Sequence, residues 1–99
     1  MKTVKVALCD RHEMPEDVTG SIFGATIDNP MMFNEMEQIV MAYISNAGLK
    51  SGDNMYLYVT GLTAAVVAVI NTCIRNKISL TLYHYDKNTG EYAPQHLWQ

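Results

Sequence analysis

The sequence is short of charge and of long apolar runs. Charged residues make up 17% of the chain, against about 25% in an ordinary soluble domain. The longest apolar run, from Ala64 to Ile70, is far shorter than the ~20 residues of a membrane span, and no signal peptide begins the chain. We therefore expect a cytoplasmic protein that does not insert into a membrane, and one that hides apolar surface in a subunit interface.

Cysteine patterns and known catalytic motifs are equally scarce. Cys9 and Cys73 stand alone, so no Cys-x-x-Cys pair suggests zinc binding or thiol exchange. The three histidines form no close His/Cys/Asp triplet with the spacing of a metal site. A Walker loop and a GxSxG nucleophile turn are also missing. The sequence predicts no metal and no cofactor.

Basic residues are too few for a protein that coats duplex nucleic acid. The formal net charge is −3, and residues 10–37 hold seven acids against one base, Arg11. Phosphate neutralisation along a duplex needs a basic stripe instead. An anionic ligand would have to be held locally, by backbone amides and a few side chains.

What the chain does have is apolar content and clear periodicity. Hydrophobic residues make up 48% of the 99 residues, enough for one core, so we expect residues 1–99 to form a single domain. Alternation and β-branched content predict strands at 3–9, 55–60, 78–85 and 91–97. Apolar spacing predicts two helices, one from the cap at 28–30 to Gly48, the other over 62–76.

These elements predict an α/β fold. Strands joined by helical crossovers pair in parallel, with right-handed connections. The turn at 86–90 then returns the chain as a C-terminal β-hairpin, with Pro94 marking an edge strand. We expect a mainly parallel central sheet with two main helices, in two or three layers.

Both helices are more apolar than one small sheet can cover. The helix over 62–76 is apolar around most of its circumference, and residues 31–44 form a methionine-rich face. Core packing explains part of this surface, and an interface explains the rest. A homodimer or a higher homo-oligomer is the expectation.

In open α/β sheets, ligands bind beyond the carboxyl ends of the strands. This rule selects three segments, which are Asp10-Arg11-His12, Thr60-Gly61-Leu62-Thr63 and the region of His84. The Thr60–Thr63 turn runs from a strand into a helix, where free amides can hold phosphate. Alternatively, Gly61 only eases the turn and Thr63 only caps the helix.

The side chains of the other two segments also have two interpretations. Arg11 can clamp a phosphate and His12 can transfer a proton near neutral pH, or both can belong to a solvated loop. His84 is either a ligand contact or a satisfied structural histidine. Tyr56 and Tyr58 share one strand face, where they can stack on bases or pack across strands.

The order of these motifs resembles a known family. An apolar strand ends in Arg11-His12, a Gly52-Asp53 pair precedes the second strand, and a small-residue turn at 61–65 opens an Ala/Val-rich helix. A strand containing Leu80-Thr81-Leu82-Tyr83 follows. The pattern is similar to small CRISPR-associated accessory proteins with a Rossmann-like fold akin to CARF domains.

The resemblance implies a homodimer that binds a cyclic oligoadenylate across its two-fold axis and so damps antiviral signalling. Some members act as metal-independent ring nucleases, with the ribose 2′-hydroxyl as nucleophile, and others sequester the ring. On this basis His12 and Arg11 are the expected catalytic residues. The expected ligand-binding residues are Asp10, Thr60, Gly61, Leu62, Thr63 and His84.

Two other functions remain open from the sequence. The chain can be a non-catalytic interaction module or regulatory subunit that docks through its methionine-rich helix. It can also be a small metal-independent enzyme acting on another nucleotide or phosphorylated metabolite. Convergence of Arg11, His12 and Gly61 at one sheet edge favours nucleotide binding, because an interaction module has no need of it.

Overall fold

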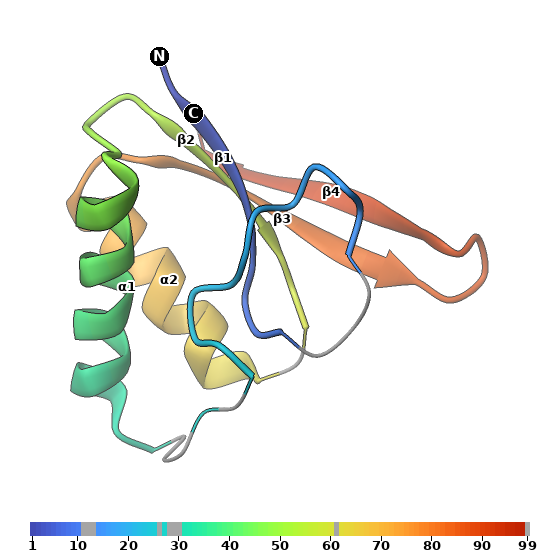
Figure 1. Cartoon of the computed structure of the whole chain (residues 1–99), viewed down its shortest axis with the longest axis horizontal. Coiled ribbons are helices and arrows are strands. Elements are labelled where there is room, and N and C mark those ends of the chain that lie inside the picture. Colours follow the sequence, from blue (N-terminus) through green and yellow to red (C-terminus); the bar gives the residue numbers. More distant parts are fainter. Residues whose placement is uncertain (11–13, 26, 28–30, 61, 99) are drawn as a thin grey trace.

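The computed structural model describes residues 1–10, 14–25, 27, 31–60 and 62–98 (Figure 1). Four strands and two helices alternate as the periodicity predicts. In chain order the elements are β1 (Thr3–Ala7), α1 (Phe33–Ala47), β2 (Asn54–Tyr58), α2 (Thr63–Arg75), β3 (Ser79–Asp86) and β4 (Glu91–Trp98).

The four strands form one mixed sheet in the order β1-β2-β3-β4. β1 pairs with β2 and β2 with β3 in parallel, with Ala7, Tyr58 and Tyr83 at the same level across the three strands. β4 returns antiparallel to β3, which is the predicted hairpin, with a register shift between Leu80 and Thr81. The sheet is therefore parallel in its first three strands and antiparallel at one edge.

Both helices cover the same face of the sheet, so the fold has two layers (Figure 1). Successive right-handed crossovers that move in one direction across a sheet place their helices on one side. Met55, Leu57 and Leu80 point to this side and are fully buried, and Val40 and Val69 meet them from the two helices. The core lies between the two layers.

The ends of α1 match the sequence prediction only in part. Gly48 ends the helix in the left-handed region at φ 71°, and its N–H returns to the carbonyls of Ile44 and Ser45, as predicted. The first helical residue is Phe33, whose N-cap Met32 makes no side-chain capping bond. The expected cap at 28–30 lies outside the described residues.

The segment before α1 adds an irregular fifth element to the sheet. Residues 19–23 run beside β1, where Thr19 donates to the carbonyl of Lys5 and Ile22 to that of Ala7. A single parallel bridge joins Ala7 and Ser21. Backbone pairing to this segment protects the outer edge of β1.

The opposite face of the sheet carries no helix and is rich in tyrosine. Tyr58 stacks on Tyr83 with 4.7 Å between ring centroids, and Tyr92 meets Tyr58 edge-on at 5.0 Å. Tyr56 and Tyr85 extend this group on either side. We call this surface the tyrosine face, and it results from tyrosines at alternating positions on β2 and β3.

Candidate functional site

The carboxyl ends of the three parallel strands meet at one edge of the sheet. Beyond the last paired residues, Leu8 N–H donates to the carbonyl of Tyr58 at 2.9 Å and Val59 N–H to that of Tyr83 at 3.0 Å. The segments that follow β1 and β2 therefore lie side by side, and His84 stands at the same level on β3. We call this region the carboxyl edge.

Thr60 connects the segments that follow β1 and β2 at the carboxyl edge, through two hydrogen bonds that we call the Thr60 clasp. Its hydroxyl accepts from Cys9 N–H at 3.0 Å and donates to the Cys9 carbonyl at 3.1 Å. Thr60 is only 6% exposed. The hydroxyl is thus committed to the backbone of the neighbouring strand, and this residue shapes the edge rather than reaching into solvent.

Helix α2 begins directly after this clasp. Its N-cap is Leu62 and its first residue is Thr63, and both side chains are exposed. No side chain of a described residue caps the helix by a hydrogen bond, and its first-turn amides and the positive end of its dipole lie at the carboxyl edge. The sequence predicted this placement from the strand–turn–helix pattern.

His84 and Asp10 complete the part of the predicted site that can be placed. His84 alternates with Leu80 and Leu82 onto the helix-bearing face, is exposed, and pairs its Nε2 with Gln95 Oε1 at 2.8 Å. Asp10 is exposed, and its N–H donates to the Gly24 carbonyl at 2.7 Å. Arg11, His12 and Gly61 lie outside the described residues.

The first turns of the two helices form an apolar hollow close to the carboxyl edge. A cavity of about 370 Å³ lies between α1 and α2, with Phe33, Ala64 and Val67 along its walls. Phe33 is 52% exposed and Val67 46% exposed. The sequence predicted that α2 has apolar surface beyond what the sheet covers, and the structure leaves part of it exposed.

Farther along, a polar cluster links the two helices. Glu37 on α1 pairs with Arg75 and accepts from Asn71 on α2. The Arg75 guanidinium holds the pKa of the Glu37 carboxyl below its usual range. This cluster fixes the angle between the helices whose first turns form the hollow.

The methionine-rich face of α1 is divided between core and surface. Met36 is buried, whereas Met31, Met32 and Met41 are exposed. Ile74 on α2 is exposed as well. Core packing therefore explains one of these methionines, whereas Met41 is exposed on α1 and Met31 and Met32 are exposed just before its first residue.

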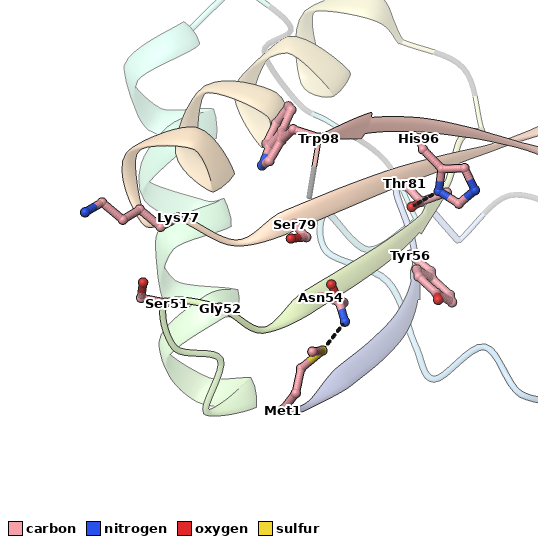
Figure 2. Close-up of a pocket in the computed structure, with 10 residues that line it drawn as sticks. All are labelled: Met1, Ser51, Gly52, Asn54, Tyr56, Lys77, Ser79, Thr81, His96 and Trp98. Atoms are coloured by element: carbon pink, nitrogen blue, oxygen red, sulfur yellow. Dashed lines mark hydrogen bonds between the residues drawn. The ribbon is translucent and has the colours of Figure 1, made fainter.

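A second concavity lies on the tyrosine face, at the amino ends of β2 and β3. It has a volume of about 580 Å³, and its walls include Asn54, Tyr56, Lys77, Ser79, Thr81, His96 and Trp98 (Figure 2). We call it the amino-end groove. Sequence reasoning missed it because the carboxyl-end rule points to the other edge. The alternation of Asn54 with Tyr56, and of Ser79 with Thr81, was the available signal.

The two cysteines are structural in this arrangement. Both are buried, and desolvation raises the pKa of the Cys73 thiol to about 12, where it is neither nucleophilic nor a ready metal ligand. Within the described part of the chain, no three His, Cys, Asp or Glu side chains gather as a metal site. No helix among the described residues is both long and apolar enough to cross a membrane.

The carboxyl edge thus combines an uncapped helix start, a strand clasp and an exposed histidine, with an apolar hollow beside them. Comparisons of this chain with protein-family models, with curated proteins and with solved structures found no match.

Proposed function

We propose that the chain binds a cyclic oligonucleotide second messenger, of the cyclic oligoadenylate class, at the carboxyl edge of a homodimer. The observation that carries this proposal is the meeting of three parallel strand ends with the uncapped start of α2. Backbone amides at such a point hold phosphate without a basic surface. That property suits a chain with a net charge of −3.

The proposal also uses the position of the apolar hollow. Phe33, Leu62 and Val67 surround the first turn of α2 and are all at least one-third exposed. A two-fold axis through this patch would bring two α2 termini together, and a ring with several phosphates needs more than one anion site. The mixed sheet with two crossover helices is compatible with the Rossmann-like, CARF-like family that the sequence resembles.

In this account each residue has a stated role. The turn from Thr60 to Thr63, including Gly61, supplies backbone amides to phosphate, while Arg11 balances negative charge. Asp10, Leu62 and His84 form the walls of the site. Thr60 acts through its clasp on Cys9, because its hydroxyl is already hydrogen bonded.

Ring cleavage would follow from positioning. The ribose 2′-hydroxyl attacks the adjacent phosphorus and loses its proton to water, the bond to the 5′ oxygen breaks, and His12 gives a proton to that leaving oxygen. The products are a 2′,3′-cyclic phosphate and a 5′-hydroxyl. If the ring stays intact after binding, the protein acts by sequestration, and either outcome damps a signal that the ring carries.

A thermal-shift panel of cyclic di-, tri-, tetra- and hexa-adenylates tests binding. A ring at 100 times its dissociation constant should stabilise the fold by ~2.7 kcal/mol. Incubation of the bound ring in EDTA then separates cleavage, which gives linear products, from sequestration. His12→Ala should abolish cleavage and preserve binding.

Variants at the start of α2 give the test its structural control. Thr63→Glu places a carboxylate where phosphate would sit. An acidic side chain in the first turn of a helix interacts favourably with the helix dipole, so the substitution should not destabilise α2. We expect it to weaken ring binding at least tenfold without loss of stability. Thr89→Glu, the same change in the exposed hairpin turn, should bind like the wild type. Absence of any shift with all four rings would overturn the proposal.

A second candidate function is docking onto another protein through the outer helical surface. Met31, Met32, Met41 and Ile74 are exposed there, and methionine suits adaptable contact surfaces. A chain that forms no homodimer and binds no ring, but whose exposed methionines are protected from oxidation by a partner, would favour this role.

A further inference from the structure

The floor of the amino-end groove is a regular array of side chains on three strands. Tyr56, Thr81 and His96 are register partners and form one row across β2, β3 and β4. Asn54 and Ser79 form the next row toward the amino ends. With strands ~4.8 Å apart and rows ~7 Å apart, the floor measures about 10 Å by 7 Å. This area matches one nucleoside.

Tyr56 gives this floor an aromatic surface. Its ring is half-buried and lies against Tyr83 at 5.5 Å between centroids, which restrains it. The Tyr56 ring also lines the groove (Figure 2). A planar base that stacks on a restrained ring gains contact area without ordering the ring first.

Two polar side chains on the floor retain hydrogen-bonding capacity. His96 bonds Thr81 Oγ1 through Nδ1 at 2.9 Å, which orients the imidazole and makes Nε2 its second donor or acceptor. The Asn54 amide nitrogen contacts only the Met1 sulfur at 2.8 Å and Thr3 Oγ1 at 3.4 Å, a weak acceptor and a long bond. A ligand with its own donors and acceptors can replace these contacts.

None of the described residues that line the groove is acidic, in a chain with ten acids and seven bases. Lys77 lies at its far end from Tyr56, at a turn with φ 57°, and forms no salt bridge with any described residue (Figure 2). The Gly52 N–H donates to the Lys77 carbonyl at 2.9 Å and holds this turn against the loop before β2. This bond fixes the Lys77 backbone at one end of the groove, whereas its exposed side chain extends away from the other lining residues (Figure 2).

We infer that the amino-end groove binds a nucleoside monophosphate, with the base on Tyr56, the base edge at His96 and Asn54, and the phosphate at Lys77. In this inference Lys77 supplies positive charge for one phosphate. Single-stranded nucleic acid is less suited, because binding along a strand needs a groove with several positive charges. The site is separate from the carboxyl edge, since it lies at the other ends of β2 and β3.

Titration of the whole chain with AMP, GMP, CMP and UMP tests this inference. Binding is followed by amide and indole NMR shifts and by fluorescence of Trp98, the chain's one tryptophan, which lines the groove. We expect saturable binding, tighter for the purines because they stack over more area. Adenosine should bind more weakly than AMP, and inorganic phosphate alone should not perturb Trp98.

Matched variants locate the ligand. Tyr56→Leu should weaken AMP binding about 5- to 150-fold through loss of stacking, whereas Tyr56→Phe should retain it. Lys77→Asn introduces a residue that tolerates positive φ and should weaken AMP binding about three- to tenfold at low salt. Lys87→Asn, the same charge change on the exposed hairpin turn, is the control.

Two results would overturn the inference. One is the absence of saturable binding by all four nucleotides, and the other is binding that Tyr56→Leu and Lys77→Asn leave unchanged in folded protein. Binding of a poly-adenylate strand with higher affinity than AMP would point to nucleic acid instead and would also overturn it. Lys77→Asn should leave cyclic-ring binding unaltered, so failure here is distinguishable from failure of the proposed function.

Discussion

Single residues decide how the carboxyl edge is held. Thr60 looks like a phosphate contact in the sequence, because it is a hydroxyl residue beside a strand-to-helix turn. In the fold its hydroxyl makes two hydrogen bonds with the Cys9 backbone. Thr60 thus connects the segments that follow β1 and β2. In the proposed site, the backbone of the turn at 60–63 faces the ligand.

The Thr60 clasp makes a measurable contribution to stability. Thr60→Val keeps the shape but removes both hydrogen bonds between the Thr60 hydroxyl and the Cys9 backbone, and we expect a loss of about 1–3 kcal/mol. Thr60→Ser keeps the hydroxyl and loses one methyl group, worth about 0.8 kcal/mol. Urea denaturation should therefore give a lower free energy of unfolding for Thr60→Val than for Thr60→Ser. The reverse order would show that the hydroxyl does not stabilise the edge.

Asp53 performs a similar task at the other end of the sheet. Its carboxylate accepts from the N–H groups of Lys2 and Lys50, at 2.9 and 2.8 Å, and so joins the start of β1 to the loop before β2. These two backbone hydrogen bonds hold the pKa of Asp53 below its usual range, and the bond from Lys2 has the larger effect. The Gly52-Asp53 pair is one of the motifs behind the family resemblance, and in the fold the contacts of Asp53 are structural.

A lowered folded-state pKa gives Asp53 a defined effect on acid stability. Its contribution is present above the unfolded pKa of about 3.9 and is lost as the pH falls through the lower folded value. Asp53→Asn should reduce stability at neutral pH and flatten the decline below about pH 4, as measured by urea denaturation between pH 2.5 and 7. Asp10→Asn controls for the change in net charge. A slope like that of the wild type would contradict the assignment.

Among the helices and strands, the sequence periodicity predicted which elements form better than it predicted where each one begins and ends. The four strands and two helices follow from alternation and from the 3.6-residue spacing of apolar side chains, and the left-handed cap at Gly48 from glycine chemistry. The start of α1 at Phe33 was not predicted. Met31, Met32 and Phe33 form an unbroken apolar run across the boundary, and the N-cap residue Met32 makes no side-chain capping bond. Local signals locate an end only where such a cap exists.

Contacts between elements explain what the sequence left open for the site. Parallel pairing was predictable, so the placement of Thr63 and His84 at one edge was too. In the amino-end groove, His96 lies opposite Thr81 in the register that continues from the hairpin turn, whereas the irregularity between Leu80 and Thr81 brings Trp98 opposite Leu80. Nothing in the strand pattern alone specifies that shift.

At the scale of the whole molecule, the helices remain partly uncovered. Both lie on one face of the sheet, so their outer surfaces meet neither sheet nor further helix in the described chain (Figure 1). Phe33, Val67 and Ile74 are about half exposed there. This exposed apolar surface is the physical basis of our proposal that the chain forms a homodimer.

A charge at the apolar hollow should separate the dimer. Val67→Lys adds an unpaired cation to a helix position that is already exposed in one chain, so the fold should persist. Sedimentation equilibrium should show a dimer dissociation constant raised roughly tenfold or more. Tyr85→Lys, at a similarly exposed residue of β3, should leave the dimer intact. Equal self-association of both variants would place the interface elsewhere.

The central claim is that two copies of the carboxyl edge hold one cyclic oligonucleotide. Isothermal titration of the wild-type chain with the cyclic adenylate that gives the largest thermal shift tests it most directly. We predict one ring per two chains, and a loss of at least tenfold in affinity for Thr63→Glu but not for Thr89→Glu. One ring per chain, or equal affinity of the two variants, would contradict the account.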